Sequence, residues 1–363
     1  MTLVLSTQDA EQVLDLGSVI ACLEETYADL GSGSAVYRGR TDLFHPTSAP
    51  IGADVPAAHQ FKTLDGAIPR WQVASIRVTS DVVAFPLVDG ARRRIKIPAA
   101  ENNSWVGLVF LFSSATGELI AILQDGILQK FAVGAINAIG AKYLARTHAR
   151  SIGLIGAGNQ AGPQIKALCH IRPIEQLRVF SPKRQETEAF CARMRDELGL
   201  EASVADSPEE AVRGVDIAVT ATNSRAPFFK ADWLEPGMHL SCMQRDEPMD
   251  ECFAKADISV FHTRMKEHEY VSTDFAAMER RHDFTMRDHP EGALDWNDFP
   301  DLGELVSGKV RKRSREDEIT LFLNSTGVGA QFTAVAHLIY ERARKAGLGT
   351  QIPTALFTQP MPP

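Results

Sequence analysis

The sequence lacks the long apolar runs of membrane proteins and the cysteine patterns of secreted or metal-binding ones. No apolar stretch approaches the roughly 18 residues of a membrane-spanning helix, and the apolar run at residues 105–112 fits a buried strand. No basic segment followed by an apolar core begins the sequence, so we expect no secretory signal and a cytoplasmic protein. The cysteines, never in CxxC spacing, are expected to be reduced packing residues: Cys22, Cys169, Cys191, Cys242 and Cys252.

The sequence also lacks an excess of positive charge and the common motifs of hydrolases. Its 38 Lys and Arg against 46 Asp and Glu give a formal net charge of −8, which argues against nucleic acid or an anionic membrane as a general partner. Ser224, Ser241 and Ser325 lie in no GxSxG elbow. The histidines between residues 262 and 289 lack HExxH spacing, so we predict no metal site.

What the sequence does contain is a dinucleotide-binding fingerprint at residues 151–161, SIGLIGAGNQA. Gly156 would permit a tight turn, Gly158 would let the backbone approach a pyrophosphate, and Ala161 would let a helix pack close to the strand. Such a motif is weak alone, but an apolar run precedes it and a second strand-like run at 177–180 follows, as the motif requires. The turn residues predicted to contact the cofactor are Gly156, Ala157, Gly158, Asn159 and Gln160.

The patterns on either side of the fingerprint differ, which predicts two domains. The 363 residues exceed the length of about 250–300 residues that single cores reach. Between residues 71 and 123 strand-like runs are separated by turns, whereas from 151 to 261 strand-like and helix-like runs alternate. This alternation predicts an α/β fold class, with a Rossmann-type doubly wound parallel sheet plus an N-terminal α+β domain. A closing amphipathic helix is expected at residues 333–346.

Several longer segments follow one another in a recognisable order over nearly the whole chain. They are DGILQKFAVGAINAIGAKYLAR at 125–146, GLIGAGNQA at 153–161, DEP at 246–248, ITLFLNSTGVGAQF at 319–332 and the helix ending KAGLG. In this order they resemble the ornithine cyclodeaminase/mu-crystallin family. FKTLDG, RVTSDVV, GAQFTAV and IPTALF are similar to a diverged branch of that family, made up of cyclodeaminase-like proteins and of proteins that resemble the B-type subunit of tyramine oxidase.

The resemblance implies an overall arrangement for the chain. Residues 1–132 and 320–363 would form the dimerisation and substrate-binding domain of a homodimer, completed by the C-terminal helix. Residues 133–319 would form the Rossmann domain that holds NAD(H) or NADP(H). A small-molecule amino or imino acid, or an amine, would lie in the cleft between the two domains.

The resemblance also implies which residues select the cofactor. At the end of the second Rossmann strand an acid would bind the ribose 2′-hydroxyl, whereas basic and small polar residues favour a 2′-phosphate. This chain has Ser181, Lys183 and Arg184 there and no acid, so we predict a preference for NADP(H), with NAD(H) possible. The alternative interpretation is a basic surface turn. Thr220 and Thr222 resemble the family stretch that lines the cofactor.

Asp246 matches the acid/base aspartate of the family. It stands in the Asp-Glu-Pro context, although Gln244 replaces the family's glycine. A carboxylate at the C-terminal end of a parallel strand would face the nicotinamide cleft, where it can pass a proton to or from an amine or activate a water. The alternative is a solvent-exposed aspartate that pairs with Arg245.

The substrate side departs from the family at two positions. Arg77 stands where the family has a substrate-contacting lysine, which keeps the charge but loses proton transfer, because arginine stays protonated. Ala132 stands where the family has an arginine that would clamp a substrate carboxylate through two hydrogen bonds. Either Arg40, Arg77 and Lys130 hold the carboxylate instead, or the substrate lacks an α-carboxylate.

These departures count against ornithine cyclodeamination, which needs a carboxylate clamp and proton handling around an internal imine. Hydride transfer between NAD(P)H and a C=N bond makes fewer demands. We therefore expect an NAD(P)-dependent oxidoreductase of the imine reductase or amino-acid dehydrogenase type, with Asp246 and Arg77 as catalytic residues. The alternatives are a cyclodeaminase-like ammonia lyase with internally recycled NAD, and a non-catalytic binding protein or partner subunit like mu-crystallin.

Overall fold

The computed structural model of this protein describes most of the chain. The described residues are 1–47, 55, 57–84, 86–88, 91–92, 95–99, 104–224, 226–245, 247–264, 269–273, 298–324 and 327–360. Asp246, the predicted acid/base residue, lies outside them. Among the described helices, none has the length and apolar character needed to cross a membrane.

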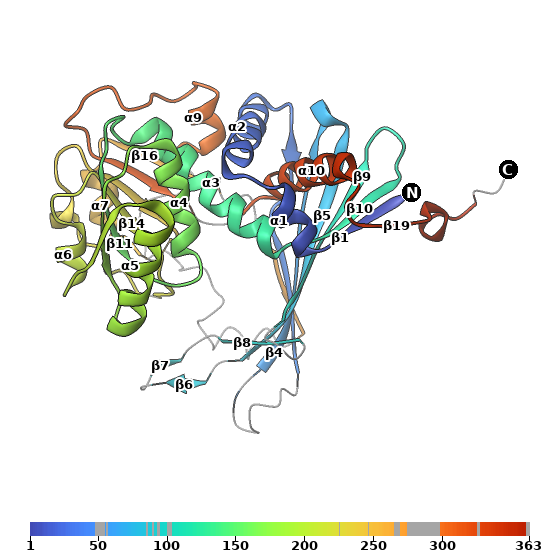
Figure 1. Cartoon of the computed structure of the whole chain (residues 1–363), viewed down its shortest axis with the longest axis horizontal. Helices are drawn as coiled ribbons and strands as arrows, with labels where there is room; N and C mark the ends of the chain where they lie inside the picture. The colour runs from blue at the N-terminus through green and yellow to red at the C-terminus, as the bar shows by residue number, and fades with distance from the viewer. Residues whose placement is uncertain are drawn as a thin grey trace.

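Ten of the described strands form one sheet, seen nearly edge-on in Figure 1. They are β1 (Thr2–Leu5), β2 (Val36–Tyr37), β3 (Thr41–Pro46), β4 (Ala57–Ile68), β5 (Val73–Ala84), β8 (Ile95–Ile97), β9 (Val106–Ser113), β10 (Leu119–Gln124), β17 (Glu269–Ser272) and β19 (Thr350–Ile352). The order along the sheet is β17-β3-β4-β5-β9-β10-β1-β19, with β2 on β4 and β8 on β5. β4 and β5 are 12 residues long and pair antiparallel over their full length. A separate ribbon joins β6 (Leu87–Val88) and β7 (Ala91–Arg92).

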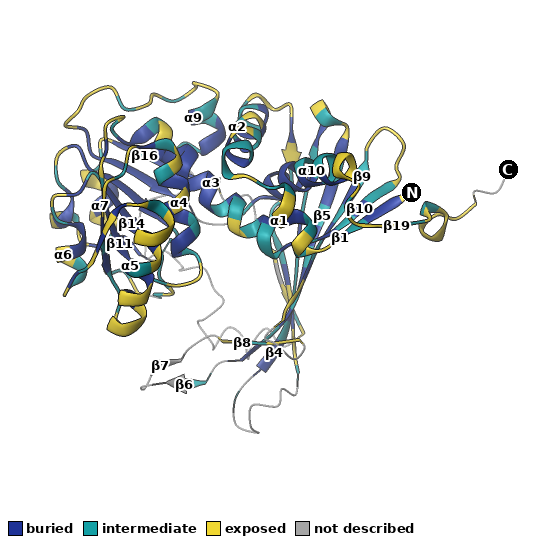
Figure 2. Ribbon diagram, viewed as in Figure 1, coloured by how far each residue is buried: buried dark blue, intermediate teal, exposed yellow. Residues whose placement is uncertain are grey.

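Helices cover one face of this sheet (Figure 1). They are α1 (Thr7–Val13), α2 (Leu16–Ser32) and α10 (Gly329–Ala346), while α3 (Gly126–Leu144) lies between this layer and the second sheet. α10 confirms the predicted closing helix and packs on β4, β5 and β9. It begins directly against β4, because a Cβ atom on Gly329 would overlap the backbone oxygen of Asp65. Figure 2 shows the buried residues gathered between this layer and the sheet.

The other face of the ten-stranded sheet carries no described helix. Successive residues of a strand point to opposite faces, and the residues on this side include exposed apolar side chains. Leu43, Val106 and Val271 are 40%, 46% and 44% exposed. A sheet face of this kind suits a protein–protein contact.

A second sheet contains seven parallel strands. They are β11 (Ser151–Ile155), β12 (Gln176–Phe180), β13 (Glu201–Val204), β14 (Ile217–Thr220), β15 (His239–Cys242), β16 (Ile258–Phe261) and β18 (Thr320–Leu323). The helices beside them are α4 (Ala161–Ile171), α5 (Arg184–Leu198), α6 (Pro208–Val212), α7 (Asp250–Lys255) and α9 (Leu302–Val306). The order is β13-β12-β11-β14-β15-β18-β16, which is a Rossmann order with β18 inserted before the last strand. The predicted α/β fold class is confirmed.

Two strands lie on the other side of the predicted domain boundaries. β17, within the stretch assigned to the Rossmann domain, pairs in parallel with β3 of the first sheet. β18, placed by the boundary at residue 320 in the first domain, pairs with β15 and β16 of the second sheet. All four residues of β18 are buried, as a central parallel strand requires. We still propose two domains, but with β17 assigned to the domain of the first sheet and β18 to the Rossmann domain.

Candidate active site

The glycine turn lies between β11 and α4, at the carboxyl edge of the parallel sheet. Gly156 has a φ of 101°, and a Cβ atom there would lie 2.5 Å from the backbone oxygen of Ala221, so the position requires glycine. A Cβ atom on Gly158 would meet nothing within 4 Å. α4 begins at the fully buried Ala161 and has no side-chain cap, which leaves first-turn N–H groups available to an anion. The turn therefore fits a pyrophosphate.

The basic residues after β12 lie at the neighbouring strand end. Lys183 Nζ is 2.7 Å from Glu186, and the guanidinium of Arg184 contacts Glu188 at 3.2 Å and Asp206 at 2.6 Å. All of these side chains are more than half exposed. Exposed ion pairs of this kind contribute at most about 1 kcal/mol, so a ligand phosphate can replace the acidic partners at little cost.

Thr220 ends β14 and Thr222 follows it, and one buried carboxylate accepts hydrogen bonds from both. Glu247, with 0% exposure, accepts hydrogen bonds from Thr220 Oγ1 at 2.6 Å and from Thr222 N and Oγ1, each at 2.7 Å. The backbone N–H of Gln244 donates to the same carboxylate at 2.8 Å. Burial raises the pKa of Glu247, and the donated hydrogen bonds oppose this rise. Glu247 therefore ties the end of β14 to Gln244, in the segment that follows β15.

Sequence reasoning missed Glu247, although it stands inside the Asp-Glu-Pro segment. The sequence did offer one signal for it, because Glu247 is a second acid directly beside Asp246, the residue predicted to be the acid/base group. Its side-chain partners Thr220 and Thr222 lie 27 and 25 residues earlier in the chain, and the parallel pairing of β14 with β15 brings them close to it.

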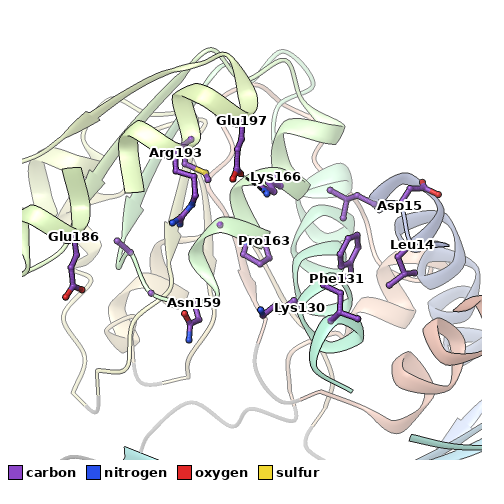
Figure 3. A pocket seen from close by; sticks show the side chains of 16 residues that line it. Leu14, Asp15, Lys130, Phe131, Asn159, Pro163, Lys166, Glu186, Arg193 and Glu197 are labelled. Atoms are coloured by element: carbon purple, nitrogen blue, oxygen red, sulfur yellow. Dashed lines mark ion pairs between the residues drawn. The ribbon is translucent and has the colours of Figure 1, made fainter. Parts of the chain in front are cut away.

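A groove of about 590 Å³ runs beside α4, between α3 and α5 (Figure 3). Lys130 of α3 lies at one end with Asn159 of the glycine turn, and the Lys166–Glu197 ion pair, 2.7 Å long, lies toward the other. Lys130 is thus placed beside the predicted cofactor turn. The groove includes neither Arg40 nor Arg77.

Arg77 lies on the helix-covered face of β5. Its Nε and Nη2 donate to Asp125 Oδ2 at 2.8 Å and 2.6 Å, and its guanidinium lies 4.4 Å from the ring centroid of Phe332. A Cβ atom on Gly107 would overlap the Asp125 carboxylate, so glycine is needed there to admit this pair. Ala132 of α3, at the position of the family arginine, is fully buried and offers no cation.

Arg40 is held in a similar way between β2 and β3. Its Nε is 2.6 Å from Asp42 Oδ2 and its Nη2 donates to Asp42 Oδ1 at 2.8 Å. Gln60 of β4 donates to the same carboxylate at 2.7 Å. Asp42 is fully buried, so Arg40 balances a charge that sequence reasoning did not identify.

The described residues contain no group of three or more His, Cys, Asp or Glu side chains that could hold a metal ion.

Known proteins resemble this chain over most of its length. The sequence model of the Ornithine cyclodeaminase/mu-crystallin family matches residues 89–347. An uncharacterized cyclodeaminase of Sinorhizobium fredii is 34% identical over 252 residues, covering 67% of this chain and 72% of that protein. A Delta(1)-pyrroline-2-carboxylate reductase of Bacillus cereus is 32% identical over 252 residues, covering 68% and 74%. The structure of Thermococcus litoralis Delta(1)-pyrroline-2-carboxylate reductase in complex with NADH and L-proline has a TM-score of 0.75 and 26% identity, covering 97% of this chain and 100% of that one.

Proposed function

The chain belongs to the ornithine cyclodeaminase/mu-crystallin family, and on this premise we propose that it is an NAD(P)(H)-dependent oxidoreductase that reduces an imine of an amino or imino acid. The observation that carries the proposal is the glycine turn after β11. Gly156 has a conformation that requires glycine, and open space lies where a Cβ of Gly158 would point. The relatives described as reductases support the choice of an imine as the substrate.

With its pyrophosphate at this turn, the dinucleotide would supply the hydride for the substrate carbon from its nicotinamide. Asp246 is proposed to pass the matching proton to or from the substrate nitrogen. Arg40 and Arg77 are proposed to face the substrate with the guanidinium donors that Asp42 and Asp125 do not use, since arginine carries five N–H donors. Because Lys130 lies beside Asn159, we assign it to the cofactor phosphates rather than to the substrate.

The test of this proposal follows the absorbance of reduced nicotinamide. Purified protein with NADPH is expected to consume it when a keto acid and an amine are supplied together, and ornithine is expected to yield little proline. Substantial proline without net change in NADPH would instead show a cyclodeaminase. Dinucleotide binding without turnover of any imine would show a non-catalytic binding protein. The Asp246→Asn variant serves as a catalytic control, and wild-type turnover in that variant would contradict the role given to Asp246.

NADP(H) is the proposed cofactor, and Arg184 provides the test. The Arg184→Ala variant is expected to raise KM for NADPH about tenfold, which is about 1.4 kcal/mol, and to change KM for NADH less than twofold. Arg150→Ala is the matched control, because Arg150 also pairs with an exposed acid, Glu175, but precedes the first residue of β11 at the opposite edge of the sheet. Tighter binding of NADH than NADPH to the unaltered protein would contradict the assignment.

We also propose a homodimer that works in the cytoplasm. The support is the apolar face of the ten-stranded sheet, where Leu43, Val106 and Val271 are exposed in the single chain. Light scattering at micromolar concentration is expected to give twice the chain mass of 39.7 kDa. A monomer at that concentration would contradict this proposal without affecting the one on chemistry.

A further inference from the structure

Beyond Arg77, the helix-covered face of the first sheet carries a second group of charges. Lys62 of β4 donates to Asp81 of β5 at 3.1 Å, and Lys96 of β8 donates to the same carboxylate at 3.0 Å. Asp81 is 2% exposed. Burial alone would raise the pKa of Asp81, but Lys62 and Lys96 hold it below its usual value. Asp81 is therefore a buried anion shared by two ammonium groups.

Each of the two arginines on this face forms an ion pair with a different carboxylate. Arg40 is paired with Asp42 and Arg77 with Asp125. In the described part of the chain, the face thus brings together four cations and three carboxylates: Arg40, Lys62, Arg77 and Lys96 with Asp42, Asp81 and Asp125.

The hydroxyl of Thr79 lies beside Lys62 on this face and has no hydrogen-bond partner among the described residues. Thr79 stands directly opposite Lys62 in the β4–β5 pairing, so the two side chains share a face and lie about 5 Å apart at Cβ. Thr79 is 5% exposed, and its Oγ1 makes no hydrogen bond in the structure. A buried hydroxyl is normally paired, because leaving it unpaired is unfavourable. Among the described residues nothing pairs with this hydroxyl, so it is able to donate a hydrogen bond to a ligand.

We propose that Lys62 and Thr79 together bind the carboxylate of the substrate, in place of the arginine that Ala132 removes from α3. The inference rests on the proposed function, because it takes the substrate to be an imino or amino acid. Lys62 would donate from Nζ to one carboxylate oxygen and Thr79 from Oγ1 to the other. The ammonium of Lys62 has three donors on a flexible stem, so it can donate to the ligand while it keeps its bond to Asp81. Asp81 acts as a positioning residue that keeps the ammonium on this face.

The Thr79→Val variant separates this role from a structural one, because it removes the hydroxyl with little change in shape. We expect KM for the imino acid to rise about tenfold while kcat stays within twofold, with a melting temperature that is unchanged or higher. A higher melting temperature with an unchanged KM would overturn the proposal, since the hydroxyl would then be only an unsatisfied group. Thr63→Val is the matched control, because Thr63 follows Lys62 on β4 and points to the opposite face.

The Lys62→Met variant keeps the length of the side chain and removes its charge. With a bound reduced dinucleotide, which cannot accept a hydride from the probe, the unaltered protein is expected to bind L-proline at least tenfold more tightly than L-prolinamide, which lacks the carboxylate charge. In Lys62→Met that preference is expected to fall to nearly one. Equal binding of the two probes by the unaltered protein, or failure to bind either, would overturn the carboxylate site.

The binding experiment also distinguishes failure of this inference from failure of the proposed function. If the protein reduces no imine but still prefers L-proline, and Thr79→Val removes the preference, the carboxylate site stands and the oxidoreductase proposal fails. If imines are reduced and the variants bind and react as the unaltered protein does, the oxidoreductase proposal stands and the carboxylate site is elsewhere.

Discussion

The Gly156→Ala variant is expected to bind dinucleotide at least one hundredfold more weakly than the unaltered protein. Gly156 has a φ of 101°, which costs a residue with a side chain about 1–3 kcal/mol. The added Cβ would also lie 2.5 Å from the oxygen of Ala221 and 3.1 Å from Cγ2 of Thr222, so the backbone of the turn must move. Moving the turn displaces the N–H groups that would face the pyrophosphate. Calorimetric titration with NADPH and NADH measures the loss.

Two neighbouring glycines provide matched controls for that result. Gly158→Ala introduces a Cβ into open space, so we expect unchanged stability but weaker dinucleotide binding, because the methyl group would occupy the approach of the pyrophosphate. Gly162→Ala also introduces a Cβ into open space, inside the first turn of α4, and is expected to stabilise the helix by up to about 1 kcal/mol, so it controls for the effect of an added methyl group on stability. Wild-type affinity in both Gly156→Ala and Gly158→Ala would contradict the assignment of the turn to the dinucleotide.

The glycine turn was predictable from sequence because its determinants are local. A tight turn, a short apolar strand and a helix start occupy consecutive residues, so their order reveals their geometry. The alternation of strands and helices after residue 151 likewise predicted the parallel sheet, which the order of β11 to β16 confirms. β17 was missed because its four residues lie in a polar stretch, and it forms a strand by pairing with β3, more than 200 residues earlier.

The charged face of the first sheet shows what local patterns leave out. Lys62 and Thr79 become neighbours only through the register of β4 against β5, and a shift of one residue would turn one of them to the opposite face. The family resemblance identified Arg77 as a site residue. It did not indicate that Arg77 pairs with Asp125, the residue that directly precedes α3. The buried ion pairs could therefore be identified only from the structure, because the spacing of residues in the sequence does not show which acid pairs with which base.

The Glu247→Gln variant is expected to lower kcat/KM about one hundredfold, equivalent to about 2.7 kcal/mol. The Glu247 carboxylate accepts four hydrogen bonds, two on each oxygen. A glutamine amide presents N–H groups in place of one oxygen, so two buried donors would face another donor, at about 1–3 kcal/mol for each group left unpaired. The ends of β14 and β15 would then separate, and with them the threonines and the loop of Asp246.

The measurement for Glu247→Gln must separate a displaced site from an unfolded chain. Circular dichroism and thermal unfolding show whether the variant is folded. A fall in kcat would indicate that the acid/base residue is displaced, whereas a rise in the dinucleotide Kd would indicate that the cofactor site is displaced. Because Glu247 directly follows Asp246, we expect the larger part of the effect in kcat. Glu251→Gln is the matched control, since Glu251 is an exposed acid four residues later, in the first turn of α7, and its removal should leave kcat/KM within twofold. A folded Glu247→Gln variant with unaltered kcat/KM would show that the carboxylate does not organise the site, and the proposed position of the acid/base loop would have to be abandoned.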